Sequence, residues 1–215
     1  MTIRDQLFEA IADHLASLSQ LGRVLDVGTG KGLLPVKIAQ RNQLLEVYGV
    51  DVSEKAIDAA RKNSLALGLK NPPQFKIGDV SNLPFEDNYF DAVVATFSLH
   101  HWPKPVSGLN EIYRVLKPGG EALIYDHSRN PSAAAKEQMR KKYGWLLSSY
   151  ALLHLKFVSS CLTEDDAQVL LNDTALKFQE KELKQHGIFL LLRLKKAENW
   201  PEGWLEARDY LFRDG

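Results

Sequence analysis

The chain has almost no cysteine. Cys161 is the single cysteine among 215 residues. One thiol excludes an intramolecular disulfide, a multi-cysteine zinc site and any relay of thiols. A chain without disulfides fits a reducing compartment, so we predict a cytoplasmic protein, and we predict no metal site.

The chain also lacks a net charge and a long apolar run. Lys and Arg together number 27, as do Asp and Glu, so no overall field attracts nucleic acid or anionic lipid. The most apolar stretch, residues 145–158, is too short to span a bilayer and is interrupted by His154 and Lys156. The first five residues lead into an amphipathic helix rather than a signal-peptide core. We therefore predict a soluble protein with no nucleic-acid partner and no stable membrane insertion.

A glycine-rich segment, Val-Leu-Asp-Val-Gly-Thr-Gly-Lys-Gly at residues 24–32, lacks the last glycine of a dinucleotide site. That site has the pattern Gly-x-Gly-x-x-Gly, whereas Leu33 stands at the final position here. The alternating glycines let backbone N–H groups approach a ligand at the start of the following helix. Asp26, at the end of the preceding apolar run, would repel a pyrophosphate. The segment therefore suits a ligand that carries positive charge, which argues against a nicotinamide oxidoreductase.

Strand and helix patterns alternate through the first 126 residues. A leading amphipathic helix ends near Gly22. Apolar runs then predict strands at residues 23–27, 45–50, 74–77, 90–96 and 121–126. Helical spacing predicts helices between them at residues 33–41, 54–67 and 106–116, the last stopped by Pro118-Gly119-Gly120. This alternation predicts a doubly wound α/β domain.

The pattern changes after Arg129. Residues 133–143 are helical and basic, residues 145–158 are apolar with no clean face, and Thr163 caps a short helix. Two strand-like runs, at residues 176–184 and 188–195, flank His186-Gly187 and predict an antiparallel hairpin. We predict a single domain over residues 1–215, with a leading helix at 1–22, a lid or substrate insert at 129–162 and a C-terminal tail at 199–215.

From residue 23 to residue 195 the chain resembles the class I methyltransferases that depend on S-adenosylmethionine (SAM). The resemblance rests on the glycine-rich segment, on Arg-Val-Leu-Lys-Pro-Gly-Gly at residues 114–120, and on the C-terminal hairpin. It is strongest to the small-molecule "type 11" enzymes, similar to those of ubiquinone and menaquinone biosynthesis. It implies a Rossmann-like, seven-stranded, mostly parallel sheet with a C-terminal antiparallel hairpin. It also implies SAM as the cofactor, whose sulfonium and ammonium match the acidic loop.

Several positions become candidates for cofactor binding. Asp51 ends the second strand, where a carboxylate can accept from both ribose hydroxyls, although such a residue often only caps a helix. The resemblance implies that Asp79 accepts from the adenine amino group, that the next backbone N–H donates to the ring, and that Thr96 lies near the methionine part. Gly-Asp at residues 78–79 is also ordinary turn chemistry. The predicted cofactor-binding residues are Asp26, Gly28, Thr29, Gly30, Gly32, Asp51, Val52, Asp79, Val80 and Thr96.

His100 and His101 are the candidates for a general base, because they follow the fourth strand and an imidazole can take a proton near neutral pH. Asp126 and His127, at the end of the fifth strand, are second candidates. A histidine pair without a catalytic role is the alternative. The insert also has more than one interpretation. It can be a cap whose apolar residues pack on the sheet. Alternatively, it is a lid over an apolar acceptor, or an amphipathic surface that binds lipid or a partner subunit.

We predict an enzyme that transfers the methyl group of SAM to a small apolar or aromatic acceptor. Two alternatives stay open: a non-catalytic SAM-binding subunit of a larger methyltransferase, and a methyltransferase that acts on protein or RNA. A homodimer is also open.

Overall fold

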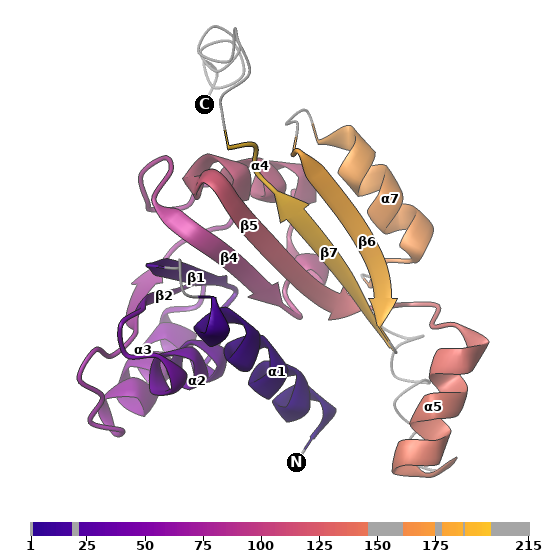
Figure 1. Cartoon of the computed structure of the whole chain (residues 1–215), viewed down its shortest axis with the longest axis horizontal. Helices are drawn as coiled ribbons and strands as arrows, with labels where there is room; N and C mark the ends of the chain where they lie inside the picture. The colour runs from indigo at the N-terminus through magenta and orange to yellow at the C-terminus, as the bar shows by residue number, and fades with distance from the viewer. Residues whose placement is uncertain (1, 19–21, 146–160, 175–177, 187, 199–215) are drawn as a thin grey trace, which may run out of the picture.

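The computed structural model describes residues 2–18, 22–145, 161–174, 178–186 and 188–198. Its centre is one twisted sheet with helices on both faces (Figure 1). The seven strands lie in the order β3-β2-β1-β4-β5-β7-β6. Their bounds are β1 Arg23–Val27, β2 Glu46–Asp51, β3 Gln74–Ile77, β4 Phe90–Thr96, β5 Leu116–His127, β6 Glu180–His186 and β7 Phe189–Lys195.

The first five strands are parallel, whereas β7 pairs antiparallel with both β5 and β6. The predicted fold, a seven-stranded and mostly parallel sheet that ends in an antiparallel hairpin, is therefore confirmed. The chain moves from β1 outward to β3, returns to the far side of β1 as β4, and continues outward. This reversal separates the loops that follow β1 and β4, and such a point is where open α/β sheets bind ligands.

Two apolar layers hold helices against the sheet. On one face α1 and α2 pack on β1, β2 and β4. On the other face α4 and α7 pack on β4, β5 and the hairpin. The described helices are α1 Ile3–Ser17, α2 Leu33–Arg41, α3 Glu54–Leu65, the short 3-10 helix η1 Leu99–His101, α4 Pro105–Val115, α5 Ala133–Tyr143 and α7 Glu164–Asp173. The inner strands are buried on both faces, as parallel strands with apolar runs require.

The bounds of β1, α2, β3 and β4 agree with the prediction, and other bounds differ. The strand β5 begins at Leu116 instead of residue 121, because Leu116 already pairs with Phe90 before the Pro-Gly-Gly segment. The register then shifts, with Gly119 at a φ of 76°, so the predicted turn is a bulge within the strand. The helix α1 ends at Ser17 rather than near Gly22, and α3 ends at Leu65 rather than at residue 67.

The C-terminal third agrees with the prediction in type but not in every boundary. The strand β6 runs over Glu180–His186, later than the predicted residues 176–184, because its register follows β7. The basic helix α5 and the helix capped by Thr163 are both present. Most of the predicted apolar run (residues 146–158 of 145–158), the turn residue Gly187 and the predicted tail at residues 199–215 lie outside the described residues. None of the helices in the described part is long and apolar enough to cross a bilayer.

Candidate functional site

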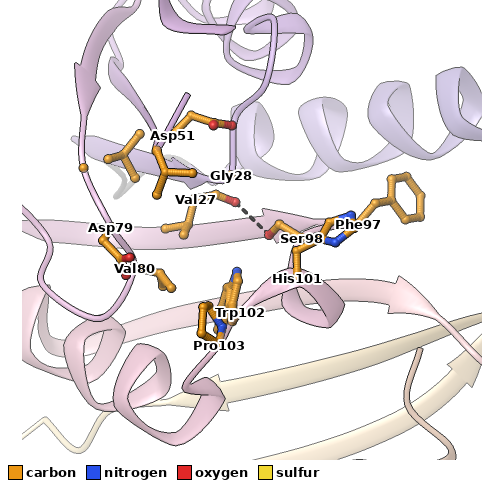
Figure 2. Close-up of a pocket in the computed structure, with 13 residues that line it drawn as sticks. Val27, Gly28, Asp51, Asp79, Val80, Phe97, Ser98, His101, Trp102 and Pro103 are labelled. Carbon is orange, nitrogen blue, oxygen red and sulfur yellow. Dashed lines mark hydrogen bonds between the residues drawn. The ribbon is translucent and has the colours of Figure 1, made fainter. Parts of the chain in front are cut away.

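A cavity of about 520 Å³ opens at the carboxyl ends of β1, β2, β3 and β4 (Figure 2). In this view Asp79 and Val80 lie on the opposite side from His101 and Phe97, with Trp102 between them. The lining residues are Val27, Gly28, Val50, Asp51, Val52, Gly78, Asp79, Val80, Phe97, Ser98, His101, Trp102 and Pro103. The cavity therefore lies at the chain reversal between β1 and β4.

The floor of the cavity depends on a close contact between the loops that follow β1 and β4. Ser98 donates its hydroxyl hydrogen bond to the carbonyl of Val27 at 3.1 Å, drawn dashed in Figure 2. A Cβ on Gly28 would lie 2.4 Å from the Cβ of Ser98, and Gly28 has a φ of 72°. A residue with a side chain would clash with Ser98 and would be strained at this φ, so only glycine fits at this position. The first glycine of the motif therefore lets the ends of β1 and β4 meet at the floor of the cavity.

The carboxylate of Asp51 is fixed by two backbone donors. Its Oδ2 accepts from the N–H of Gly30 at 2.9 Å, and its Oδ1 accepts from the N–H of Ser53 at 2.9 Å. Each carboxylate oxygen keeps a free lone pair. The glycine loop after β1 thus orients the acid at the end of β2, and two acceptor positions remain for vicinal hydroxyls.

Asp79 begins the wall of the cavity beside β3. Its Oδ1 accepts from the N–H of Ser81 at 2.7 Å, and its carbonyl accepts from the N–H of Asn82 at 3.0 Å. The residue therefore makes the turn that its sequence suggests and also lines the cavity. A turn at residues 78–79 is therefore compatible with a role of Asp79 in the cavity.

Asp26 is buried behind the loop, with 1% of its surface exposed. Its Oδ1 has no hydrogen-bond partner in the described part of the chain. Burial raises the pKa of the Asp26 carboxyl to about 7, a nearby hydroxyl on Thr29 opposes the rise, and the charge of Asp51 adds to it. An unpaired acid beside a cradle of glycines is the environment that a cationic ligand would complete.

The structure separates the two adjacent histidines of η1. His101 lines the cavity, whereas the side chain of His100 is only 8% exposed and is bound to Asp126. His100 Nδ1 lies 2.7 Å from Asp126 Oδ1, and the His100 backbone N–H donates to Asp126 Oδ2 at 2.9 Å. This contact occupies Nδ1 and leaves Nε2 as the ring nitrogen that is not bound to Asp126. The first candidate for the base is thus paired with a second candidate from the next strand.

Aromatic and apolar side chains gather beyond Phe97. This residue has a φ of 55°, an uncommon conformation for a bulky side chain. Its ring stacks on the His127 imidazole with centroids 4.6 Å apart, and the Phe189 ring lies 5.3 Å away. Met139 of α5 and Leu7 of α1 pack in the same cluster. The described part of the insert therefore joins the wall beside the cavity through Met139.

Six of the predicted site residues line the cavity, namely Gly28, Asp51, Val52, Asp79, Val80 and His101. The other six, Asp26, Thr29, Gly30, Gly32, Thr96 and His100, lie behind that surface or beside it, and their roles stay predictions. The sequence predicts that residues 96–102, at the end of the fourth strand, border the site, and Phe97, Ser98, His101 and Trp102 of this segment line the cavity. Val50 and Pro103 line it as well and were not predicted. Each directly follows or precedes a predicted position, so widening the predicted segments by one residue finds both.

The residues present fit SAM on two observations: the cradle at Gly28 that a Cβ would fill, and the unpaired buried oxygen of Asp26. Asp51 and Asp79 add carboxylates where hydroxyl and amino groups need acceptors. Within the described residues, no three His, Cys, Asp or Glu side chains cluster as a metal site requires.

The sheet order and the C-terminal antiparallel hairpin are those of the class I methyltransferase fold. Residues 25–124, just under half of the chain, match the family described as "Methyltransferase domain". The chain is similar to the SAM-dependent methyltransferases, as its sequence predicts, and SAM is the cofactor of that family.

Two curated relatives are similar over part of the chain. The 27-O-demethylrifamycin SV methyltransferase of Amycolatopsis mediterranei is 33% identical over 130 residues, which is 59% of this chain and 47% of that protein. The ubiquinone/menaquinone biosynthesis C-methyltransferase of Geobacter sulfurreducens is 31% identical over 165 residues, or 76% of this chain and 61% of that protein. The chain therefore matches about half to three fifths of the length of these relatives.

Solved structures share the fold. A SAM-dependent methyltransferase from Aquifex aeolicus has a TM-score of 0.66 with 21% identity, covering 87% of this chain and 88% of that one. The [4+2]-cyclase SpnF has a TM-score of 0.65 with 20% identity, covering 89% of this chain and 82% of that one. Because a cyclase shares the fold, the fold alone does not determine which reaction this chain catalyses.

Proposed function

We propose that this chain transfers the methyl group of SAM to a small, apolar or aromatic acceptor. The observation that carries the proposal is the cavity at the chain reversal, with carboxylates at one end and an oriented imidazole beside the other. SAM supplies a methyl group already activated on a sulfonium, so transfer needs alignment, and a base only where the acceptor carries a proton.

On the cofactor side, Asp51 would hold the ribose hydroxyls and Asp79 the adenine amino group. The backbone N–H groups of Gly30 and Ser53 fix the Asp51 carboxylate, so ribose binding requires no rearrangement there. Asp26 would supply negative charge behind the loop. Val52 is 67% exposed at the rim of the cavity, where an apolar side chain would cover a bound base.

On the acceptor side, the cluster beyond Phe97 favours a ring or an apolar chain. Phe97 lines the cavity, the buried Phe189 and Met139 pack behind it, and the His127 imidazole stacks on its ring. The names of the two relatives mention a rifamycin and a quinone, both of which contain rings. One is an O-methyltransferase by its substrate name and the other a C-methyltransferase, so the atom methylated stays open.

We propose that His100 and His101 act together in proton transfer, with His101 facing the cavity and His100 packed against His101. Asp126 is 1% exposed and holds His100 through both its side chain and its backbone N–H, which fixes the ring. Asp126 is then a positioning residue. His101 lies with its ring centroid 3.9 Å from that of His100 and faces the cavity, where it would contact the acceptor.

The test is a labelled-methyl assay with purified protein, SAM carrying a labelled methyl group and a small-molecule extract of the source organism. Mass spectrometry would identify the product. We expect label in an extractable apolar compound, and less transfer by Asp51→Ala protein at a SAM concentration below saturation. Calorimetry with SAM and S-adenosylhomocysteine accompanies the assay.

The outcomes separate the alternatives. Binding of SAM without transfer to any small molecule would favour a non-catalytic subunit. Label in the protein or RNA fraction would replace the small acceptor with a macromolecule. Absence of SAM binding would refute the proposal altogether. Three predictions are independent of this assay: the boundaries of the single domain, the cytoplasmic location and a homodimer. Analytical ultracentrifugation of the purified protein checks the homodimer.

A further inference from the structure

One face of α4 carries an ion pair that the proposed chemistry does not use. Arg114 binds Glu111, three residues earlier, through Nε to Oε1 at 2.7 Å and through Nη2 to Oε2 at 2.7 Å. The two side chains are 19% and 11% exposed. Paired two-point contacts of this kind are stronger and more directional than single ones.

The remaining contacts of this pair reach the loop between β3 and β4. Arg114 Nη1 donates to the carbonyl of Phe85 at 2.8 Å and to Asp87 Oδ1 at 2.9 Å, while Nη2 donates to the carbonyl of Leu83 at 3.0 Å. Glu111 Oε2 accepts from the N–H of Leu83 at 2.7 Å. All five N–H donors of the guanidinium can therefore be matched with acceptors.

That loop folds back on the wall of the cavity. Pro84 packs on Gly78, where an added Cβ would lie 2.8 Å from the Pro84 Cδ. Gly78 is followed directly by Asp79 and Val80, and all three line the cavity. The position of Leu83 and its neighbours therefore determines where the Asp79 carboxylate lies.

The same face of α4 also supports the wall directly. An added Cβ on Gly108 would lie 2.8 Å from Trp102 Cε3 and 3.1 Å from Val80 Cγ2. Gly108, Glu111 and Arg114 recur at intervals of three, so they share one side of the helix. The helix α4 thus contacts Trp102 and Val80 directly, and it supports Gly78 through the loop between β3 and β4.

We propose that Glu111 and Arg114 are positioning residues for adenine recognition, a brace that holds the Asp79–Val80 wall. Neither side chain lines the cavity. They act by fixing the loop from Leu83 to Asp87, and the inference rests on the proposed function of the cavity as a SAM site.

The test compares two ligands that differ at the adenine amino group, S-adenosylhomocysteine and S-inosylhomocysteine. Calorimetry measures the dissociation constant of each for wild-type and Arg114→Gln protein. We expect a loss of about tenfold for the adenosyl ligand, the cost of one misplaced hydrogen bond to a charged group. For the inosyl ligand, which lacks the amino group, we expect a loss below about threefold.

Two further variants keep the test informative. Arg193→Gln breaks an ion pair with Glu121 on β5, away from the cavity, and should leave both constants unchanged. If Arg114→Gln protein does not fold, Asp87→Ala removes one loop contact and leaves the Arg114–Glu111 pair in place. This milder change should give a loss of about threefold for the adenosyl ligand alone.

If folded variants lose affinity equally for both ligands, or lose none for either, the proposed positioning role of Glu111 and Arg114 is refuted. Failure of the wild-type protein to bind S-adenosylhomocysteine would instead refute the proposed function. The two failures are therefore distinguishable.

Discussion

Replacing Asp26 with asparagine should stabilise the protein at pH 8 and weaken SAM binding. Asp26 is 1% exposed, and burial raises its pKa from 3.8 to about 7. The folded protein therefore favours the neutral carboxyl, whereas the unfolded chain ionises freely above pH 4. Between these two values the unfolded chain binds fewer protons, so the free energy of unfolding falls as the pH rises.

The magnitude follows from the two pKa values. The full interval corresponds to about 4 kcal/mol at high pH. Between pH 5 and pH 8 the free energy of unfolding should fall by about 2.5 kcal/mol through this one group. An asparagine side chain does not titrate, so the Asp26→Asn variant should lose this part of the pH dependence. Any other effect of the amide on the free energy of unfolding is the same at every pH and does not change this comparison.

The assay is urea unfolding of wild-type and Asp26→Asn protein at several pH values between 5 and 8, without ligand. The difference between the two free energies is plotted against pH. A cationic ligand should favour the ionised carboxylate. SAM binding to the wild-type protein near pH 7 should therefore release protons, measurable as a dependence of the calorimetric heat on the ionisation enthalpy of the buffer.

Parallel pH profiles for the two proteins would refute the assignment of a raised pKa to Asp26. Equal proton release with SAM and with S-adenosylhomocysteine would refute the role of the ligand's charge, because the latter has no sulfonium. Asp26→Asn protein should bind the two ligands with more similar affinities than the wild-type protein does.

Four other substitutions test three separate parts of the site. Gly28→Ala should cost about 1–2 kcal/mol of stability from its positive φ alone and more from a 2.4 Å contact with the facing serine, and it should abolish SAM binding. Gly30→Ala, which has a φ of 54° but open space around the added Cβ, is the matched control for the steric part of this loss in thermal melting. Asp51→Ala should weaken SAM binding by about 1–3 kcal/mol, and unchanged affinity in calorimetry would contradict ribose binding there. His100→Ala and His101→Ala should lower kcat with little change in the SAM dissociation constant, by about a hundredfold or more for His100; full turnover by both would mean that positioning alone suffices.

The cofactor side of the site could be predicted from the sequence because its determinants are local. The Gly28 turn, the buried β1 strand and the start of α2 lie within about twenty residues, and their bounds follow from apolar runs and backbone sterics. The position of Asp51 can be predicted in the same way, because it lies at the end of the second strand. The remaining sheet depends on which strands pair, and that information is spread over the chain.

Features that depend on pairing between distant segments were not predicted. Ser98 meets Val27 across 71 residues, and neither segment alone indicates the contact. The early start of β5 depends on pairing between Leu116 and Phe90, which overrides a Pro-Gly-Gly segment that is typical of a turn. Local propensity predicts a break at this point, and sheet pairing converts that break into a bulge.

The segment after β4 shows the same dependence on tertiary structure, and this explains why the sequence left both histidines as candidates for the base. His100 and His101 are adjacent and chemically identical, so no local rule distinguishes them. The parallel register of β4 and β5 pairs Thr96 with Tyr125, which brings Asp126 to the segment that follows Thr96. Asp126 then binds His100 and leaves His101 facing the cavity. The difference between the two imidazoles arises from strand register, so a change that shifts β5 against β4 should impair the His100–Asp126 pair while leaving the Gly28 loop and the Asp51 carboxylate intact.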